Sequence, residues 1–124
     1  MKPKVSIEVH PGIYISSIDP DEWEFDAEVN GEAHIVVEEA TAYAGLERYL
    51  EPIEPQVWTL PEREVVLILE GAVRIEIEGG TTLELQAGDI ASLPKGAVTT
   101  WHITTPFKEM WFFGRPYEQD ATSA

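Results

Sequence analysis

The residue of this sequence best placed to do chemistry is Glu64, an acid that stands directly before an apolar run. The run continues as Val65–Leu69, and strand alternation places the Glu64 side chain on the same face as Val66 and Ile68. If that face is buried, the carboxylate loses hydration and its pKa rises, which suits the group to general acid or base catalysis. The alternative is a structural carboxyl that is hydrogen-bonded to Thr99 or to a tyrosine.

Two tryptophans and three basic residues could act beside this carboxyl. Trp58 and Trp101 are candidates for stacking on a planar or sugar-like ligand, although the same rings could simply fill the interior. Arg48, Arg63 or Lys108 would lower the pKa of the carboxyl if one of them reached it. Lys108 could also bind an acidic substrate, or it could remain solvated.

Residues 64–96 must position these side chains, and they follow a strand pattern interrupted by glycine turns. Within Ala72–Glu78 apolar and charged residues alternate with a period of two, which is typical of a half-buried strand. Gly79–Gly80 predicts a hairpin turn, because glycine accepts a positive φ without steric cost. Gly45 is expected to mark a bulge or a close approach, and Thr105–Pro106 a turn between the last two strands. The predicted strands are residues 5–9, 13–15, 33–39, 41–50, 56–60, 65–69, 72–78, 81–86, 90–93, 98–104 and 107–113.

The composition predicts a single domain. The chain has 124 residues with 44% hydrophobic content, which is enough for one core. Cysteine is absent from the sequence, which excludes disulfides and thiolate metal sites. No stretch approaches the length of a membrane-spanning helix, and the N-terminus lacks the apolar run of a signal peptide. We therefore expect a soluble, cytoplasmic protein.

The charge balance is strongly acidic, with 23 acidic against 8 basic residues and a net charge of −15. Such a surface repels phosphate backbones and anionic lipids, so neither nucleic acid nor a membrane is an expected partner. The charge favours solubility and says little about a buried pocket.

Two spaced motifs bear on the fold. Glu64 is followed by Gly71 after six intervening residues, and Gly88 is followed by Pro94 after five and then by Gly96 after one. This pattern resembles the two cupin motifs, over about residues 33 to 113. The resemblance implies an all-β fold, the cupin double-stranded β-helix, which is an RmlC-like jelly-roll barrel.

Within the cupins, the chain is similar to small members related to (S)-ureidoglycine aminohydrolase and to the ethanolamine-utilisation cupin domains. The features that carry this similarity are Gly79–Gly80, Gly88–Asp89, Pro94–Gly96, Trp101 and Lys108. We accordingly expect an N-terminal arm with edge strands at residues 1–32, the cupin barrel at 33–114 and a flexible tail at 115–124.

The sequence departs from the metal-binding members of that family. Their metal is held by the glutamate, by two histidines just before it and by a third histidine three residues after the Pro-x-Gly. Those histidine positions hold other residues here: Trp58 and Leu60, or Val57 and Thr59 if the spacing is one longer, and Thr99. His102 has the opposite parity to Trp101 and faces away. Because a first-row metal ion needs three or four ligands, we expect a degenerate site with no metal and no other cofactor.

Two hypotheses of function follow. The first is a binding module that holds a small polar metabolite in the barrel mouth, with Trp58, Leu60, Thr99 and Trp101 as ligand-binding residues beside Glu64. The second is an enzyme on a small nitrogenous or carboxylated metabolite, as the two related groups imply, with Glu64 as the acid/base group. The fold alone does not decide between them.

A second copy of the chain is the other expected partner. In the last predicted strand Phe107, Trp111 and Phe113 share one face, while Met110 and Phe112 share the other. A strand with two apolar faces must be covered twice, once by the core and once by a partner. The pattern therefore favours a homodimer that forms by sheet packing.

Overall fold

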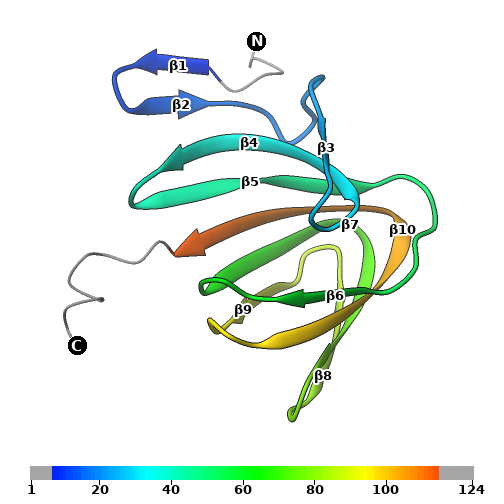
Figure 1. Cartoon of the computed structure of the whole chain (residues 1–124). Coiled ribbons are helices and arrows are strands. Elements are labelled where there is room, and N and C mark those ends of the chain that lie inside the picture. The colour runs from blue at the N-terminus through cyan, green and yellow to red at the C-terminus, as the bar shows by residue number, and fades with distance from the viewer. Residues whose placement is uncertain (1–6, 115–124) are drawn as a thin grey trace, which may run out of the picture.

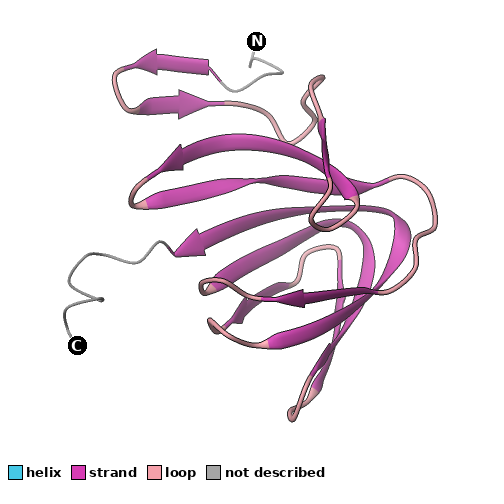
Figure 2. Cartoon of the chain, in the orientation of Figure 1, coloured by secondary structure: helices cyan, strands magenta, loops and turns pink. Residues whose placement is uncertain are grey.

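The structure, a computed structural model, describes residues 7–114, and every regular element in this range is a β-strand (Figure 2). The strands are β1 (Ile7–His10), β2 (Ile13–Ile15), β3 (Glu24–Asp26), β4 (Gly31–Glu39), β5 (Ala42–Tyr49), β6 (Gln56–Thr59), β7 (Glu64–Ile77), β8 (Thr82–Gln86), β9 (Ile90–Leu93) and β10 (Val98–Gly114). The predicted all-β class is confirmed. Within the described range no helix is long and apolar enough to cross a membrane.

Eight of these strands form one antiparallel sheet in the order β3-β4-β5-β10-β7-β8, with β6 paired to β10 and β9 paired to β7. Figure 1 shows this sheet curling on itself, so that β6 and β9 lie across the barrel from β4 and β5. Strands β1 and β2 pair only with each other, as a separate hairpin beside β4. The result is the predicted jelly-roll barrel.

Two strands are longer than the sequence pattern predicted. Residues 65–69 and 72–77 belong to one strand, β7, which ends one residue before the predicted Glu78, and residues 98–104 and 107–113 belong to β10. Gly71 has a φ of 83°, and a Cβ there would collide with the carbonyl oxygens of Thr104 and Pro106. Glycine therefore lets β7 bend past the irregularity in β10 instead of ending. The expected turn at Thr105–Pro106 is wrong for this reason.

Two other predictions for glycine, the hairpin turn at Gly79–Gly80 and the close approach at Gly45, agree with the structure. Gly79 has a φ of 74° in the turn between β7 and β8, and the Gly80 amide donates to the Ile77 carbonyl at 2.9 Å. At Gly45 an added Cβ would lie 2.5 Å from the His34 carbonyl oxygen on β4. The close approach predicted at Gly45 is confirmed.

Strand alternation separates the inside of the barrel from its outside. The side chains that are buried deepest come from β7, from β10 and from the residue that follows β6: Val66, Ile68, Ile75, Thr99, Phe107 and Leu60. On β10 the inward residues keep one parity, which is the periodicity that strand geometry imposes. On β7 the inward parity changes at the bend at Gly71, from Val66 and Ile68 before it to Ile75 after it.

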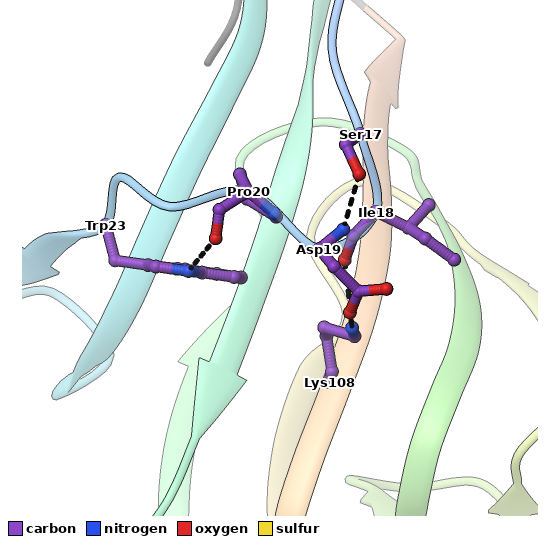
Figure 3. A network of polar contacts seen from close by, with 6 residues as sticks. All are labelled: Ser17, Ile18, Asp19, Pro20, Trp23 and Lys108. Atoms are coloured by element: carbon purple, nitrogen blue, oxygen red, sulfur yellow. Dashed lines mark hydrogen bonds and ion pairs between the residues drawn. The ribbon is translucent and has the colours of Figure 1, made fainter. Parts of the chain in front are cut away.

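Residues 16–23, here called the strap, run over the outer face of the sheet and tie the hairpin to the barrel. The Lys108 Nζ donates to the Ile18 carbonyl at 2.9 Å and contacts the Asp19 carboxylate, and the Trp23 indole donates to the Pro20 carbonyl at 3.0 Å (Figure 3). The Arg48 guanidinium lies 4.2 Å from the centre of the Trp23 ring.

The buried His34 ring fastens the start and the end of the strap. Its Nε2 accepts a hydrogen bond from the Ser16 hydroxyl at 2.7 Å, because its Nδ1 must donate to the Glu22 carbonyl oxygen at 2.9 Å. Both ring nitrogens are thus satisfied, and His34 faces away from the barrel interior.

Candidate functional site

The barrel is open and encloses a cavity of about 400 Å³. That volume lies within the range of small-molecule sites. Its walls come from the inner faces of β3, β5, β6, β7 and β10 and from two loops. The lining residues are mainly aromatic and acidic: Asp26, Glu28, Val29, Tyr43, Glu47, Tyr49, Gln56, Trp58, Pro61, Glu62, Glu64, Trp101, Ile103, Phe107, Glu109, Trp111 and Phe113.

Three buried glutamates form the polar part of the wall. Glu47 on β5, Glu64 at the start of β7 and Glu109 on β10 are 5%, 4% and 6% exposed. Glu47 and Glu109 stand directly opposite each other in the β5–β10 pairing. All three carboxyls are therefore held on rigid strands, facing one cavity.

Each of these carboxyls keeps one oxygen without a donor. Glu47 Oε2, Glu64 Oε1 and Glu109 Oε1 are buried, and no group among residues 7–114 hydrogen-bonds to them. An unpaired buried acceptor costs free energy, on the order of 1–3 kcal/mol. These three acceptors and the buried, unpaired Trp111 Nε1 donor make the cavity wall a polar surface.

Burial and mutual repulsion raise the pKa of all three groups. Burial raises the pKa of Glu64 to about 7, against the opposing effect of a hydrogen bond from the Trp58 indole. Burial, followed by the nearby Glu64 charge, raises the pKa of Glu109 well above its usual range. The pKa of Glu47 reaches about 10, chiefly through burial and then through Asp26 and Glu109. Near neutral pH, Glu64 is thus the group poised to gain or lose a proton.

The basic residues that could have neutralised Glu64 are engaged elsewhere. Arg48 binds Glu32 at 2.8 Å outside the barrel, and the Arg63 guanidinium donates to the Ser92 hydroxyl at 2.8 Å. Lys108 holds the strap, as described above. Among the described residues that line the cavity, none is Lys, Arg or His.

The four residues that the sequence suggested as ligand contacts fall into two pairs. Trp58 and Trp101 line the cavity, and Trp101 is 6% exposed. Leu60 and Thr99 do not line it: Leu60 is packed in the core, and the Thr99 hydroxyl donates to the Trp58 carbonyl at 2.6 Å while accepting from the Trp101 indole at 2.7 Å. Thr99 therefore orients the Trp101 indole and holds the backbone of Trp58, and we leave Leu60 and Thr99 out of the candidate site.

The side chains of the described residues do not form a metal site. Within residues 7–114 no group of three His, Cys, Asp or Glu side chains is placed to hold one. His10 lies on the β1–β2 hairpin and His34 lies beneath the strap, while His102 Nε2 faces Glu76 at 3.2 Å on the outer side of β10. The parity predicted for His102 is confirmed.

Sequence reasoning missed Glu47 and Glu109, which the structure places beside Glu64. The alternation of side chains along residues 107–113 did contain a signal for Glu109, because Glu109 has the same parity as the inward-facing Phe107 and Trp111. Glu47 likewise shares its parity with Tyr49 on β5. Because charged side chains are mostly exposed in proteins, parity alone did not single out either acid.

The architecture is shared with several solved structures. A protein described as ethanolamine utilization protein Q from Salmonella typhimurium LT2 has a TM-score of 0.75 at 20% identity, over 91% of this chain and 94% of that one. The Clostridium difficile EutQ protein has a TM-score of 0.69 at 14% identity, over 90% of this chain and 94% of that one. KdgF from Halomonas sp. has a TM-score of 0.64 at 17% identity, over 79% of this chain and 91% of that one. The fold is therefore that of a cupin.

Within the cupins, residues 55–111 match the family model of the EutQ-like cupin domain. This segment runs from just before β6 into β10 and contains Trp58, Glu64, Trp101 and Glu109. This region of the chain is thus similar to the EutQ-like cupin domain. A comparison with curated proteins finds no match.

Proposed function

We propose that this protein binds a small organic amine in the barrel cavity. The observation that carries the proposal is the wall itself: three buried carboxyls, each with an unpaired oxygen, face a cavity lined by aromatic rings. Carboxylates bind ammonium groups through charge-assisted hydrogen bonds. Aromatic faces attract cations and cover the carbon part of a ligand.

The same wall disfavours the carboxylated metabolites that the sequence left open. An anion would enter a cavity whose charged side chains, among the residues described, are all acidic. Where Glu64 is ionised, above its pKa of about 7, the anion would meet like charge in a site that excludes much of the water, where repulsion is stronger than in solution. Nitrogenous ligands therefore fit better, which agrees with the reference to ethanolamine in the name of the Salmonella protein.

Nuclear magnetic resonance on the full chain tests the proposal. Its four tryptophans are built-in probes, because Trp58, Trp101 and Trp111 line the cavity whereas Trp23 lies on the outer strap. Titration with 2-aminoethanol or 1,4-diaminobutane should shift the three cavity indole signals and leave Trp23 unchanged. Ethylene glycol and acetate should shift none of them. If no amine shifts the cavity signals at millimolar concentration, the proposed function is wrong.

A specific observation also supports an enzyme as the second candidate. The pKa of Glu64 lies at about 7, which is the range in which one carboxyl can both accept and return a proton at physiological pH. If an amine is converted in the cavity, Glu64→Gln should abolish turnover while 2-aminoethanol still shifts the cavity tryptophans. Unchanged turnover in this variant would remove Glu64 from the acid/base role.

A further inference from the structure

We propose that the cavity binds diamines, with one ammonium group at Glu64 and the other at the Glu47–Glu109 pair. This inference rests on the amine-binding function proposed above and adds the class of amine. It is carried by the strand register, which divides the three buried carboxyls into two acidic poles with an apolar wall between them.

The inward-facing side chains of β5, β10 and β7 form rows across the sheet, because paired residues on neighbouring strands share a face. Three successive rows, each running from β5 through β10 to β7, are Tyr43–Phe113–Glu64, Gly45–Trp111–Val66 and Glu47–Glu109–Ile68. The first row holds one buried acid, the middle row holds none, and the third row holds two acids side by side. The carboxyls are thus distributed over two places on the wall.

The register also sets the backbone distance between the two poles. Glu64 pairs with Phe113, which is four residues from Glu109 along β10. Four residues of extended strand span about 13 Å between their Cα atoms. This spacing assigns the two poles to opposite ends of a ligand and not to one ligand atom.

The wall between the poles is suited to a hydrocarbon chain. Val66 is fully buried, and the Trp111 ring lines the cavity with its centre 4.8 Å from that of Tyr43 and 5.4 Å from that of Phe113. Aliphatic and aromatic side chains of this kind favour the removal of methylene groups from water. The order of acid, apolar wall and acid therefore matches a chain of methylenes with an ammonium group at each end.

Each pole offers buried acceptors to its own ammonium. Glu64, Glu47 and Glu109 are more than nine-tenths buried, line the same cavity and each keep one oxygen without a donor among residues 7–114. Two acids opposite each other on neighbouring strands repel, and the nearby Asp26 adds to this repulsion at Glu47. A cation at this pole compensates for it. If Glu64 is ionised and the pair keeps one proton, two carboxylates balance the two ammonium groups.

Calorimetric titration of the full chain at pH 8 tests this binding at two poles. The ligands are α,ω-diaminoalkanes from 1,3-diaminopropane to 1,8-diaminooctane, each compared with the n-alkylamine of the same carbon number. A diamine too short to reach both poles should exceed its monoamine about twofold, because either end can bind, whereas at the best length the ratio should be at least tenfold. A ratio near twofold at every length, with measurable monoamine binding, overturns the diamine proposal and leaves amine binding intact. If no amine binds, the proposed function fails as well.

Variants at the two poles locate the ammonium groups. The double variant Glu47→Gln/Glu109→Gln removes one pole, and Glu64→Gln removes the other. Each should lower the ratio of diamine to monoamine affinity at the best length to about twofold. Glu84→Gln, on the exposed side of β8 outside the cavity, is the matched control: it also removes one acidic group, but it should leave the ratio unchanged. A full ratio in either folded pole variant would contradict the proposal, and if the double variant does not fold, Glu64→Gln decides alone.

Discussion

Glu47 shows how strongly the cavity acts on a single side chain. Its carboxyl is buried, faces Glu109 across the strand pair and lies near Asp26 at the end of β3. These surroundings favour the neutral form, and Trp111 Nε1 lies beside the carboxyl without completing a hydrogen bond. Glu47 therefore holds a proton in the folded protein at pH values where the unfolded chain has lost it.

This difference predicts how stability depends on pH. The Glu47 pKa is about 10 in the fold against 4.5 for the ordinary carboxyl. Between these values the folded state binds more protons than the unfolded state, so the free energy of unfolding decreases as pH rises. Glu47→Gln has no proton to lose, so it should unfold at a higher temperature than the wild type at pH 9 and at a similar temperature at pH 4.5.

Differential scanning calorimetry across pH 4.5 to 9 measures this effect, and the difference between the two proteins isolates Glu47 from the other acids. The control is Glu84→Gln, whose carboxyl is exposed on β8. Its curve should run parallel to that of the wild type. A parallel curve for Glu47→Gln would show that Glu47 is ionised in the fold.

Glu64 sets the pH dependence of amine binding. Its pKa is about 7 in the empty cavity, and a bound ammonium would lower it by favouring the carboxylate. Below pH 7 the ligand must therefore displace a proton, so affinity for 2-aminoethanol should rise with pH and level off above about pH 7. Above about pH 9.5 it should fall, because the amine itself loses its proton.

Titration calorimetry in buffers of different ionisation enthalpy would count the protons released in this pH range. In Glu64→Gln the rise with pH between 5 and 7 should be reduced or absent. A wild-type affinity that does not change with pH would show that Glu64 does not contact the ammonium.

At the residue scale the sequence predicted part of the site. Glu64, Trp58 and Trp101 were recognised from alternation and from the cupin spacing, and all three line the cavity. Glu47 and Glu109 were missed because an acid on a strand is usually solvated, and only the pairing of β5 with β10 shows that both point inward. Such pairing between distant strands is not visible in local periodicity.

Among the elements, β5 depends on Gly45 for its place between β4 and β10. A Cβ at this position would lie 2.5 Å from the His34 carbonyl oxygen and 3.0 Å from Cζ2 of Trp111. The first contact is to backbone and cannot be relieved by a side-chain rotation. Gly45→Ala should therefore destabilise the protein by about 1–3 kcal/mol, and it should weaken amine binding because Trp111 lines the cavity.

Urea unfolding and calorimetric titration measure the two effects. The matched control is Gly80→Ala in the β7–β8 turn, where the added Cβ would lie 3.4 Å from an Ile77 methyl group, an ordinary contact. This variant should remain within about 0.5 kcal/mol of the wild type. Equal stability of the two alanine variants would contradict the close approach at Gly45.

The errors at the element scale have a common cause. The sequence divided β7 at Gly71 and β10 at Thr105–Pro106, because glycine and proline usually end strands. In the fold these two interruptions face each other, so each compensates for the other and both strands continue. The turn at Gly79 has no such partner strand, and there the local prediction was right.

At the scale of the whole molecule, the outer face of the sheet is apolar although the chain carries a net charge of −15. Two rows run across β5, β10, β7 and β9. One row joins Leu46, Met110, Leu67 and Ile90, and the second joins Ala44, Phe112, Val65 and Ser92. Leu46 and Ala44 are already buried within this chain and Ser92 is polar, so the exposed apolar part lies over β10, β7 and β9. Met110 is 40% exposed, Phe112 38% and Ile90 68%. An exposed apolar face of this kind marks an interaction surface.

We propose that this face joins two copies of the chain, as the apolar residues on both sides of β10 led us to expect from the sequence. Each copy is strongly acidic, so repulsion between copies opposes association at low ionic strength. Salt screens that repulsion and leaves the apolar contact intact.

Sedimentation equilibrium should therefore show tighter dimers in 0.5 M than in 0.05 M sodium chloride. Phe112→Ser should shift the protein to monomer, whereas Val57→Ser, which changes an exposed residue on β6 outside the two rows, should not. A wild-type protein that stays monomeric at high salt would exclude the dimer.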